Sequence, residues 1–416
     1  MTHWTSIPPS MKLSWNASDS TPCSWVGVQC DSNHHHSHFV VSLNLSGFQI
    51  LGQLGPEIAE LTQLKSIDFS NNGFTGSIPS ELGNCSLIEY LELSQNSFTG
   101  DIPESFGKLL NLRFINLYSN FMKGSIPEPL FRIPHLDTVW LDVNEINGSI
   151  PLNVGNMSEI SSLWLYGNQL SGTIPSSIRN CTKLVELYLN DNEFVGDLPE
   201  SLNNLEELMY LDVSNNSLEG TIQLGLGNFK QMDTLVLSFN YFSSGTPPGL
   251  GNCNSLTQLA AVRCRLTGPI PHSLGQLTQR TLLFLCENRL SGRIPPELGN
   301  LKSLNDLQLY NNQLEGEIPI ELGLLSELQN LFLFTNRLDG SIPSDVGTCS
   351  TLTRLILKQN SLTGVVPEFL KNPNPLFVDL SNNRLTGPIP SSLVNLTNVT
   401  YIGLAMNRLT GLICGS

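Results

Sequence analysis

Residues Leu64–Pro79 read LKSIDFSNNGFTGSIP, and the spacing of this stretch recurs along most of the chain. About sixteen units fit if Phe48 and Cys264 count as irregular members. The asparagine returns every 24 residues, with a gap at Cys264 and one interval a residue shorter, at Asn72, Asn96, Asn120, Asn144, Asn168, Asn192, Asn216, Asn240, Asn288, Asn312, Asn336, Asn360, Asn383 and Asn407. Such a period predicts one continuous solenoid rather than several globular domains.

The pattern around each asparagine is L-x-x-L-x-L-x-x-N-x-L-x-G-x-I-P, which is typical of leucine-rich repeats. We expect an α/β solenoid, a right-handed leucine-rich repeat superhelix with a parallel β-sheet on its concave face and short 3-10 or helical turns on its convex face. The buried asparagine amide should bond to backbone groups of adjacent turns. Cys264 cannot do this well, so its repeat should be locally irregular.

The expected organisation is a partial, cysteine-containing N-terminal cap over residues 1–38 and a repeat domain over residues 39–416, with an incomplete last repeat and no C-terminal cap. No apolar run approaches the ~18 residues that span a bilayer, and the first ten residues lack a signal-peptide pattern. We therefore expect neither an export signal nor an anchor. Nine N-x-S/T sequons point the other way, to an extracellular glycoprotein, at Asn16, Asn44, Asn84, Asn147, Asn156, Asn180, Asn215, Asn395 and Asn398.

The cysteines fall into three groups. Cys23 and Cys30 lie before the first repeat, at a spacing suited to a disulfide that closes the end of the solenoid. Cys264 and Cys286 are two residues out of register in adjacent turns, too far apart for easy bridging. Four cysteines share one slot of the repeat and are expected to be buried thiols, namely Cys85, Cys181, Cys253 and Cys349.

Residues six, four, two and one before each asparagine should face outward from the sheet. Their aromatic members in the first half of the chain are Tyr90, Phe114, Tyr118, Trp140, Trp164, Tyr166, Tyr188 and Tyr210. Acidic residues lie between them, among them Glu92, Asp142, Glu186 and Asp212. Exposed aromatic residues of this kind are typical of binding surfaces, although neighbouring rings could simply stack on one another. The acids and the net charge of −15 favour a basic partner and disfavour nucleic acid.

Further along the chain, this outward track ends at two cations in one strand, Arg354 and Lys358. Two cations on one face can hold a carboxylate, although they could also be ordinary solvated side chains. The residues predict an extended basic peptide whose C-terminal carboxylate reaches this pair. The aromatic residues that continue the track toward it are Phe284, Tyr310, Phe332 and Phe334.

No enzyme signature occurs in the sequence, neither a phosphate-binding loop, a nucleophile elbow nor a kinase motif. The histidines at 34–36 and His38 have no Cys or carboxylate partner at a recognised spacing. We therefore expect no catalysis, no cofactor and no metal site.

The segment Trp15–Ser18 followed by Pro22–Asp31 resembles the N-terminal cap of plant leucine-rich repeat receptor-like kinases. Gly52–Ile58, Leu130–Pro134 and Pro199–Asn203 are most similar to the receptors for endogenous danger (Pep) peptides. The resemblance implies an ectodomain at the extracellular face of the plasma membrane that binds a basic peptide on its inner surface. It also implies recruitment of a co-receptor kinase with a shorter leucine-rich repeat ectodomain, followed by immune signalling. The segment 353–358 matches the family's site for the C-terminal end of the peptide.

The sequence also departs from that family, because relatives carry a secretion signal, more repeats, a second cap, a membrane span and a kinase. We therefore expect a shortened ectodomain that makes no direct membrane contact. Two alternatives remain open at this point: an extracellular protein like the polygalacturonase inhibitors, and a soluble decoy receptor. The inhibitors are shorter and have cysteine caps at both ends, which counts against them.

Overall fold

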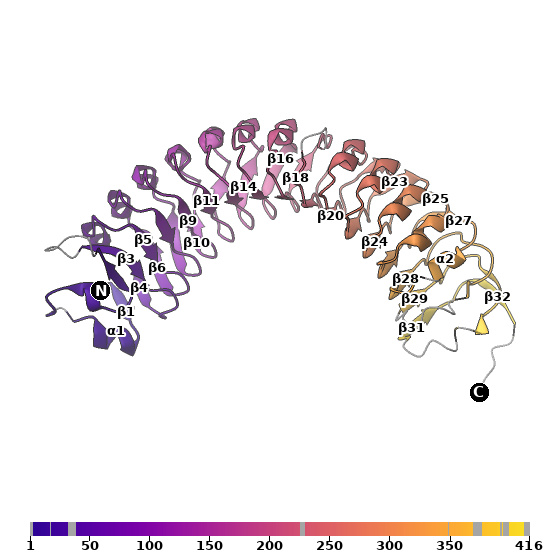
Figure 1. Ribbon diagram of the computed structural model, residues 1–416, viewed down its shortest axis with the longest axis horizontal. Helices are drawn as coiled ribbons and strands as arrows, with labels where there is room; N and C mark the ends of the chain where they lie inside the picture. Colours follow the sequence, from indigo (N-terminus) through magenta and orange to yellow (C-terminus); the bar gives the residue numbers. More distant parts are fainter. Residues whose placement is uncertain are drawn as a thin grey trace. The chain divides into compact units, whose positions relative to one another are not determined.

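The structure is a computed structural model that describes residues 3–16, 18–31, 39–224, 229–347, 349–368, 377–391, 393 and 399–411 (Figure 1). The chain divides into two compact units, Met1–Val195 and Gly196–Ser416. Each unit is a stack of leucine-rich repeats, so the predicted solenoid fold is confirmed. In most repeats a short strand of the main sheet is followed by a strand of a second row and then by a 3-10 turn.

The main sheet is parallel, and its strands pair one repeat apart, as in Trp140↔Trp164 of unit 1 and Phe284↔Gln308 of unit 2. In unit 1 the strands are β3 (Val40–Asn44), β5 (Ser66–Asp68), β7 (Tyr90–Glu92), β9 (Phe114–Asn116), β11 (Thr138–Trp140), β13 (Ser162–Trp164) and β15 (Glu186–Tyr188). In unit 2 they are β17 (Tyr210–Asp212), β19 (Thr234–Val236), β20 (Gln258–Ala260), β22 (Leu282–Phe284), β24 (Asp306–Gln308), β26 (Asn330–Phe332), β28 (Arg354–Ile356), β29 (Phe377–Asp379) and β31 (Tyr401–Gly403).

The second row of strands contains the glycine of the G-x-I-P pattern or ends just before it, and most of these glycines have a positive φ. In unit 1 the row comprises β4 (Leu51–Gln53), β6 (Gly73–Ser77), β8 (Ser97–Asp101), β10 (Phe121–Lys123), β12 (Asn147–Gly148) and β14 (Gln169–Gly172), and β16 (Glu193–Asp197) spans the division. In unit 2 it comprises β18 (Ser217–Glu219), β21 (Thr267–Gly268), β23 (Arg289–Gly292), β25 (Gln313–Glu317), β27 (Arg337–Asp339), β30 (Thr386–Pro388) and β32 (Arg408–Thr410).

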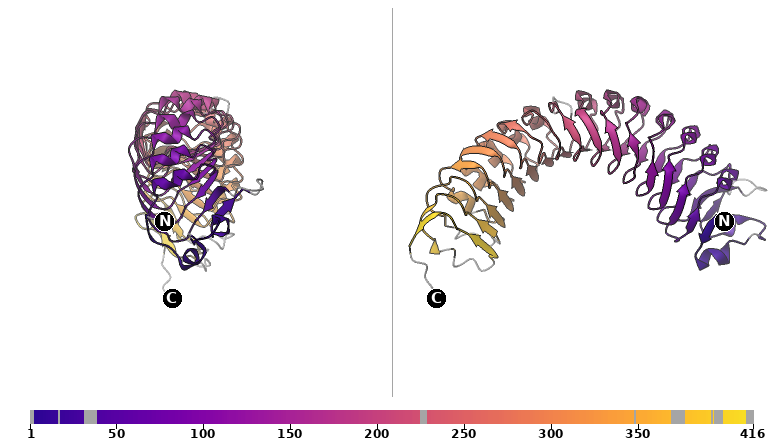
Figure 2. Two further views of the ribbon diagram at one scale, coloured as in Figure 1. Left: turned by 90° about the vertical axis from the view of Figure 1, so that its left-hand side faces the viewer. Right: turned by 180° about the vertical axis from the view of Figure 1, so that it is seen from behind.

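Most of the 3-10 turns begin right after the repeat proline, which cannot donate to a strand ladder. Within each unit they lie on the side of the stack opposite the main sheet (Figures 1 and 2). In unit 1 they are η2 (Pro56–Glu60), η3 (Ser80–Asn84), η4 (Glu104–Lys108), η5 (Glu128–Arg132), η6 (Leu152–Asn156) and η7 (Ser176–Asn180). In unit 2 they are η8 (Glu200–Asn204), η9 (Pro248–Asn252), η10 (His272–Gln276), η11 (Pro296–Asn300) and η12 (Ile320–Leu324), followed by the short helix α2 (Ser344–Gly347).

The repeat asparagine forms the predicted ladder of hydrogen bonds. The Nδ2 atom of Asn72 donates to the carbonyl oxygens of Leu45, Phe69 and Ser70 at 2.7–3.1 Å, and its Oδ1 accepts from the backbone N–H of Ile50 at 2.9 Å. One side chain thus satisfies four backbone groups of two turns, groups that would be costly to bury unpaired. The same bonds recur in later repeats, for example at Asn312.

The repeat of Cys264 is irregular, as predicted. Its thiol donates to the carbonyl of Leu237 at 3.1 Å, the acceptor that an asparagine would use, but a thiol cannot reproduce the whole set of amide bonds. Both Arg263 and Arg265 take a left-handed conformation, with φ of 53° and 60°, whereas other repeats have a single such non-glycine residue at this turn. The substitution of the asparagine therefore changes the backbone locally without interrupting the main sheet.

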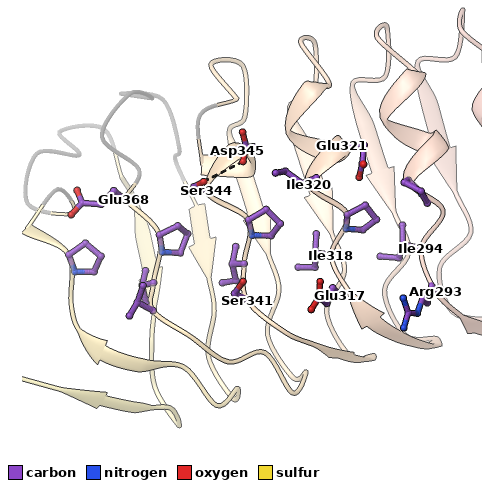
Figure 3. Close-up of a pocket in the computed structure, with 18 of the residues that line it drawn as sticks. Arg293, Ile294, Glu317, Ile318, Ile320, Glu321, Ser341, Ser344, Asp345 and Glu368 are labelled. Carbon is purple, nitrogen blue, oxygen red and sulfur yellow. Dashed lines mark hydrogen bonds between the residues drawn. The ribbon is translucent and has the colours of Figure 1, made fainter.

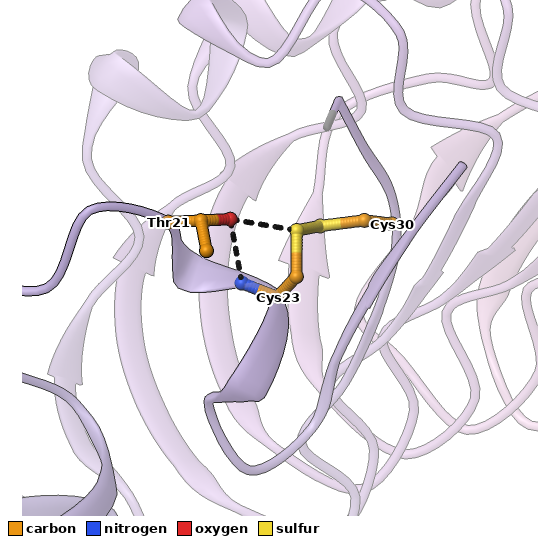
Figure 4. The surroundings of a disulfide bond; sticks show 3 residues. All are labelled: Thr21, Cys23 and Cys30. Carbon is orange, nitrogen blue, oxygen red and sulfur yellow. Dashed lines mark hydrogen bonds between the residues drawn. A yellow bond between two sulfur atoms is a disulfide. The ribbon is translucent and has the colours of Figure 1, made fainter. Parts of the chain in front are cut away.

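The N-terminal segment covers the first repeat with β1 (Trp4–Ser6), α1 (Pro9–Ser14), η1 (Pro22–Ser24) and β2 (Val28–Cys30). Strand β2 pairs antiparallel with β3, and β1 pairs antiparallel with β4. The predicted disulfide joins Cys23 to Cys30, and the hydroxyl of Thr21 accepts the backbone N–H of Cys23 at 3.3 Å (Figure 4). The four cysteines of the shared slot are buried, as predicted, and Cys264 and Cys286 are not bridged to each other.

A candidate binding surface on the main sheet

The strands of the main sheet point alternate side chains outward, and we call this outward surface the strand face. In β11, Val139 is buried, whereas Thr138 and Trp140 are partly exposed. Because the strands pair with a shift of one whole repeat, residues in the same slot lie beside one another at the ~4.8 Å spacing of neighbouring strands. The strand face of each unit is therefore a set of columns, and each column repeats one slot of the sequence.

Five rings on the strand face of unit 1 form a continuous series, which we call the aromatic ladder: Tyr90, Phe114, Trp140, Trp164 and Tyr188. Their successive ring centroids lie 4.5, 5.3, 4.4 and 5.4 Å apart. The contacts alternate between stacked and edge-to-face geometry, both of which are favourable for aromatic pairs. The rings thus cover one another in part, yet all five remain partly exposed.

A carboxylate is fixed within this ladder. Glu186 Oε2 accepts hydrogen bonds from the indole N–H of Trp164 at 2.9 Å and from the hydroxyl of Ser162 at 2.8 Å. The hydroxyl of Ser162 in turn accepts the indole N–H of Trp140 at 2.9 Å. Both indoles are therefore oriented by one acidic group, and negative charge is held at the surface between the rings.

Asp142 does not meet the expectation that every acid of the track faces solvent, because its side chain is fully buried. It occupies the same slot as Tyr118 and Tyr166 of the neighbouring repeats, whose larger side chains flank it. Neither carboxylate oxygen has a hydrogen-bond partner. Burial raises the pKa of Asp142 to about 6, and the hydroxyl of Tyr166, which falls short of hydrogen-bonding geometry, offsets only part of this effect.

Glu92 is also buried, in contrast to the expectation. It accepts the backbone N–H of Ser94 and the side-chain amide of Asn116, both at 2.8 Å, and burial raises its pKa. Asp212 in unit 2 likewise accepts the backbone N–H of Ser214 at 2.8 Å, although it stays partly exposed. In both repeats the acid lies four residues before the asparagine and accepts a hydrogen bond from the serine two residues after the acid. The acid thus caps the turn, so part of the acidic track has a structural role.

In unit 2 the predicted aromatic residues are all partly exposed on the strand face. Tyr310 and Phe334 stack with their centroids 4.3 Å apart. Tyr210 lies in the slot six residues before the asparagine, and Phe284 and Phe332 lie four residues before it. These three rings contact no other ring within the described part of unit 2. The aromatic surface of unit 2 is accordingly less continuous than the ladder of unit 1.

The two predicted cations of β28 and its turn differ in their surroundings. Arg354 is exposed, and its charge acts on the half-buried carboxyl of Asp306 by partly lowering a pKa that desolvation raises. Lys358 lies 3.4 Å from Asp379 and 5.6 Å from the ring centroid of Phe334. Lys358 is thus already paired with a carboxylate, so the two cations are not equivalent.

Sequence reasoning missed further members of the unit 2 surface. Phe377 and Tyr401 stack at 4.5 Å, in the slot that holds Arg354 one and two repeats earlier. Outside the strand face, the guanidinium of Arg265 lies 4.2 Å from the ring centroid of the exposed Tyr241, and both residues share the slot of Phe121, one residue after the asparagine position. The column pattern was the signal for Phe377 and Tyr401, because both lie in the slot six residues before the asparagine.

The predicted glycosylation sites within the described residues all have exposed asparagines, namely Asn16, Asn44, Asn84, Asn147, Asn156, Asn180 and Asn215. Asn395 and Asn398 lie outside the described residues, as do the histidines at 34–36, His38 and Cys414. In the part of the chain that the structure describes, no group of His, Cys, Asp and Glu side chains could hold a metal ion. No helix there is both long and apolar enough to cross a bilayer.

Family comparisons agree with the repeat pattern. Residues 2–31 match the leucine rich repeat N-terminal domain, and the leucine rich repeat family matches residues 63–85, 87–109, 159–181, 183–205, 207–229, 281–301 and 376–396. A receptor-like protein kinase of Ipomoea nil is 57% identical over 65 residues, which cover 16% of this chain and 6% of that protein. The matched segment is therefore a small part of that relative's length.

Solved structures extend the likeness over almost the whole chain. The structure of PEPR1, a leucine-rich repeat receptor-like protein kinase of Arabidopsis thaliana, with AtPEP1 has a TM-score of 0.77 at 38% identity. The comparison covers 98% of this chain and 71% of that chain. The Arabidopsis receptor kinase HAESA, solved with the peptide hormone IDA and the co-receptor SERK1, has a TM-score of 0.54 at 28% identity, covering 97% of this chain and 84% of that chain.

Proposed function

The chain belongs to the leucine-rich repeat ectodomains of plant receptor kinases, and from this membership we propose that its strand face binds an extended basic peptide in danger signalling. The observation that carries the proposal is the aromatic ladder with Glu186 fixed inside it. Aromatic rings held in place by hydrogen bonds bury large areas at little cost in side-chain entropy, and such residues dominate binding energies.

The charge of the surface favours a cationic ligand. Glu186 is partly exposed, and its Oε1 atom takes part in none of the described hydrogen bonds of this cluster. A lysine or arginine of the ligand would meet the carboxylate and the faces of two indoles together, an arrangement that suits both ion pairing and cation–π contact. The net charge of −15 would also speed the approach of a basic peptide.

Within unit 2 we assign the C-terminal carboxylate of the peptide to Arg354, with Lys358 as a second contact. The exposed guanidinium of Arg354 can bind a carboxylate through two parallel hydrogen bonds. Lys358 would have to share its charge with Asp379. Under this assignment Arg354 contributes more to the binding of the peptide than Lys358 does. The C-terminal end of the peptide then lies at β28.

The setting of this site is part of the same proposal. The curated relatives are receptor kinases, and HAESA was solved with a co-receptor. We infer that this ectodomain acts on the extracellular side of the plasma membrane and recruits a co-receptor kinase after the peptide binds. The described residues belong to the N-terminal segment and the repeats, so the chain contributes recognition rather than catalysis.

Calorimetric titration of the oxidised, glycosylated chain with the AtPEP1 peptide tests the proposal. Binding by the free-acid peptide that weakens on C-terminal amidation is the expected result. A chain with native circular dichroism that binds neither form would overturn peptide recognition by the strand face. Equal affinity for both forms would retain peptide binding and remove the role of Arg354.

A further inference from the structure

A second surface lies on the flank of unit 2, away from the strand face, and encloses about 1020 Å³ (Figure 3). It crosses five repeats, and the repeat prolines from Pro295 to Pro390 run along it. Its floor consists of the buried residues before these prolines, Ile294, Ile318, Ile342 and Val366. We call this surface the flank groove.

The rim of the flank groove combines acidic and apolar groups. The lining includes four carboxylates, those of Glu317, Glu321, Asp345 and Glu368, and one guanidinium, that of Arg293. Figure 3 shows Arg293, Glu317 and Ser341 along one edge and Glu321 and Asp345 toward the other. Ile320 and Val365 are exposed to 57% and 59% beside them. An exposed apolar surface with an excess of one charge is typical of an interaction site.

The equivalent flank of unit 1 provides an internal comparison, because the same repeat geometry produces a groove of about 740 Å³ there. That groove has a single carboxylate, Glu128, which is paired with Arg132 at 2.9 Å. In the flank groove, by contrast, Glu317, Glu321 and Glu368 enter none of the ion pairs found among the described residues. The flank groove therefore has a larger acidic excess than the unit 1 groove.

Sequons separate the two flanks as well. The unit 1 groove includes Gly148 and Ser149 of the sequon at Asn147. No sequon occurs between Asn215 and Asn395, a stretch that contains every residue of the flank groove. A glycan is bulky and solubilising, and its attachment would obstruct a protein partner. The flank groove is thus acidic and has no sequon among its lining residues.

We propose that the flank groove is a second docking surface that takes an extended segment of a protein partner in which apolar and basic residues alternate. Five repeats at ~4.8 Å extend about 20 Å, the length of roughly six extended residues. Alternate apolar side chains of such a segment would cover the isoleucine and proline floor. The long basic side chains between them would reach the carboxylates at the rim while their stems pack on apolar surface.

The test uses the full chain and a fluorescent hexapeptide of alternating leucine and lysine, acetylated and amidated, with binding measured by anisotropy. The triple variant Glu317→Gln, Glu321→Gln, Glu368→Gln should bind about tenfold more weakly, since each exposed ion pair contributes modestly. The matched variant Glu128→Gln in unit 1 should bind as the unaltered chain does. No loss in the triple variant, or equal loss in both variants, would overturn the proposal.

A second peptide separates a groove from a merely acidic surface. Replacing the leucines by serines should weaken binding by about tenfold, because the floor would then remain uncovered. Equal binding of both peptides would overturn the proposal. The triple variant should also keep its affinity for AtPEP1, since the flank groove is separate from the strand face, and loss of AtPEP1 binding would contradict that separation. A chain that binds the hexapeptide but not AtPEP1 supports the flank groove while overturning the proposed strand-face function.

Discussion

The indole nitrogen of Trp164 donates a 2.9 Å hydrogen bond to Oε2 of Glu186, which lies one repeat further along unit 1. The bond joins an aromatic residue and an acidic residue of the strand face across two paired strands, β13 and β15. It therefore presents ring and charge as one rigid element. If these two side chains were flexible, they would lose conformational entropy when a ligand binds. Because the hydrogen bond already orders them in the folded protein, that cost does not arise on binding.

The first prediction concerns this element. Trp164→Ala should lower the affinity for AtPEP1 by roughly a hundredfold, since aromatic residues at the centre of an interface cost about 2 kcal/mol or more when truncated. Tyr188→Ala should act in the same direction. Phe121→Ala is the matched control, because Phe121 is exposed in the second row of strands, off the strand face. Calorimetry decides the outcome, and unchanged affinity in both ladder variants would exclude the strand face as the peptide site.

The second prediction separates the two cations. Arg354→Ala should remove most of the preference for a free-acid peptide over its amide, whereas Lys358→Ala should remove less, because Asp379 already shares its charge. Asp379→Ala should release Lys358 and raise the affinity of the free-acid peptide by a fewfold, in line with a partly exposed ion pair. Titration of each variant with both peptides is the measurement. Identical losses for acid and amide in Arg354→Ala would rule out a carboxylate site.

The repeat period was sufficient to predict the fold. Each slot of the pattern places a residue either in the core or at the surface, so Asn72, Phe74 and Ile78 could be positioned from the sequence alone. The irregular turn at Cys264 also followed, because a thiol lacks the donors and the acceptor of an amide. These predictions succeeded because one local rule is repeated under nearly identical surroundings.

The candidate site was less predictable, because surface side chains respond to their neighbours across the sheet. Asp142 occupies an outward slot, yet the tyrosines on either side bury it. Lys358 is an exposed cation in the pattern, yet Asp379 of the next repeat pairs with it. One departure was visible and overlooked: Arg280 stands in the slot that holds Leu256 and Leu304 in the repeats on either side.

The third prediction follows from the burial of Asp142. Its pKa in the folded protein, about 6, exceeds the value of 3.8 expected in the unfolded chain, so the folded state binds more protons between these pH values. The free energy of unfolding should therefore decrease as the pH rises from about 4 to 6, by up to about 3 kcal/mol. Asp142→Asn should remove this dependence and stabilise unit 1 at pH 7.

Hydrogen exchange of strands β11 and β13 at pH 4.5 and 7 would measure this effect locally. Asp101→Asn is the control, because Asp101 is exposed in the second row of strands and its replacement should change stability by less than about 0.5 kcal/mol. If exchange in the unaltered chain is as slow at pH 7 as at pH 4.5 after correction for intrinsic rates, Asp142 has a partner that compensates its charge.

The fourth prediction concerns Arg280, which is fully buried and whose three guanidinium nitrogens all lack a hydrogen-bond partner. Burial lowers its pKa to about 9, an effect that the neighbouring Cys253 only partly offsets. A base with a lowered pKa binds fewer protons when folded, so the free energy of unfolding should rise as the pH increases above about 9. Below pH 9 the full cost persists, on the order of 5 kcal/mol at most.

Arg280→Leu restores the residue type of the neighbouring repeats and should stabilise the surrounding strands at pH 7 by at least about 2 kcal/mol, because it removes an unpaired buried charge. Since long repeat arrays do not unfold in one step, the measurement is hydrogen exchange of β20 and β22 rather than a global transition. Arg289→Gln is the control, because Arg289 is an exposed arginine nine residues after Arg280 in the same repeat. Unchanged or faster exchange in Arg280→Leu would mean that a buried anion or water compensates the charge of the guanidinium. The core of unit 2 would then contain a polar site at this repeat rather than an unpaired charge that destabilises it.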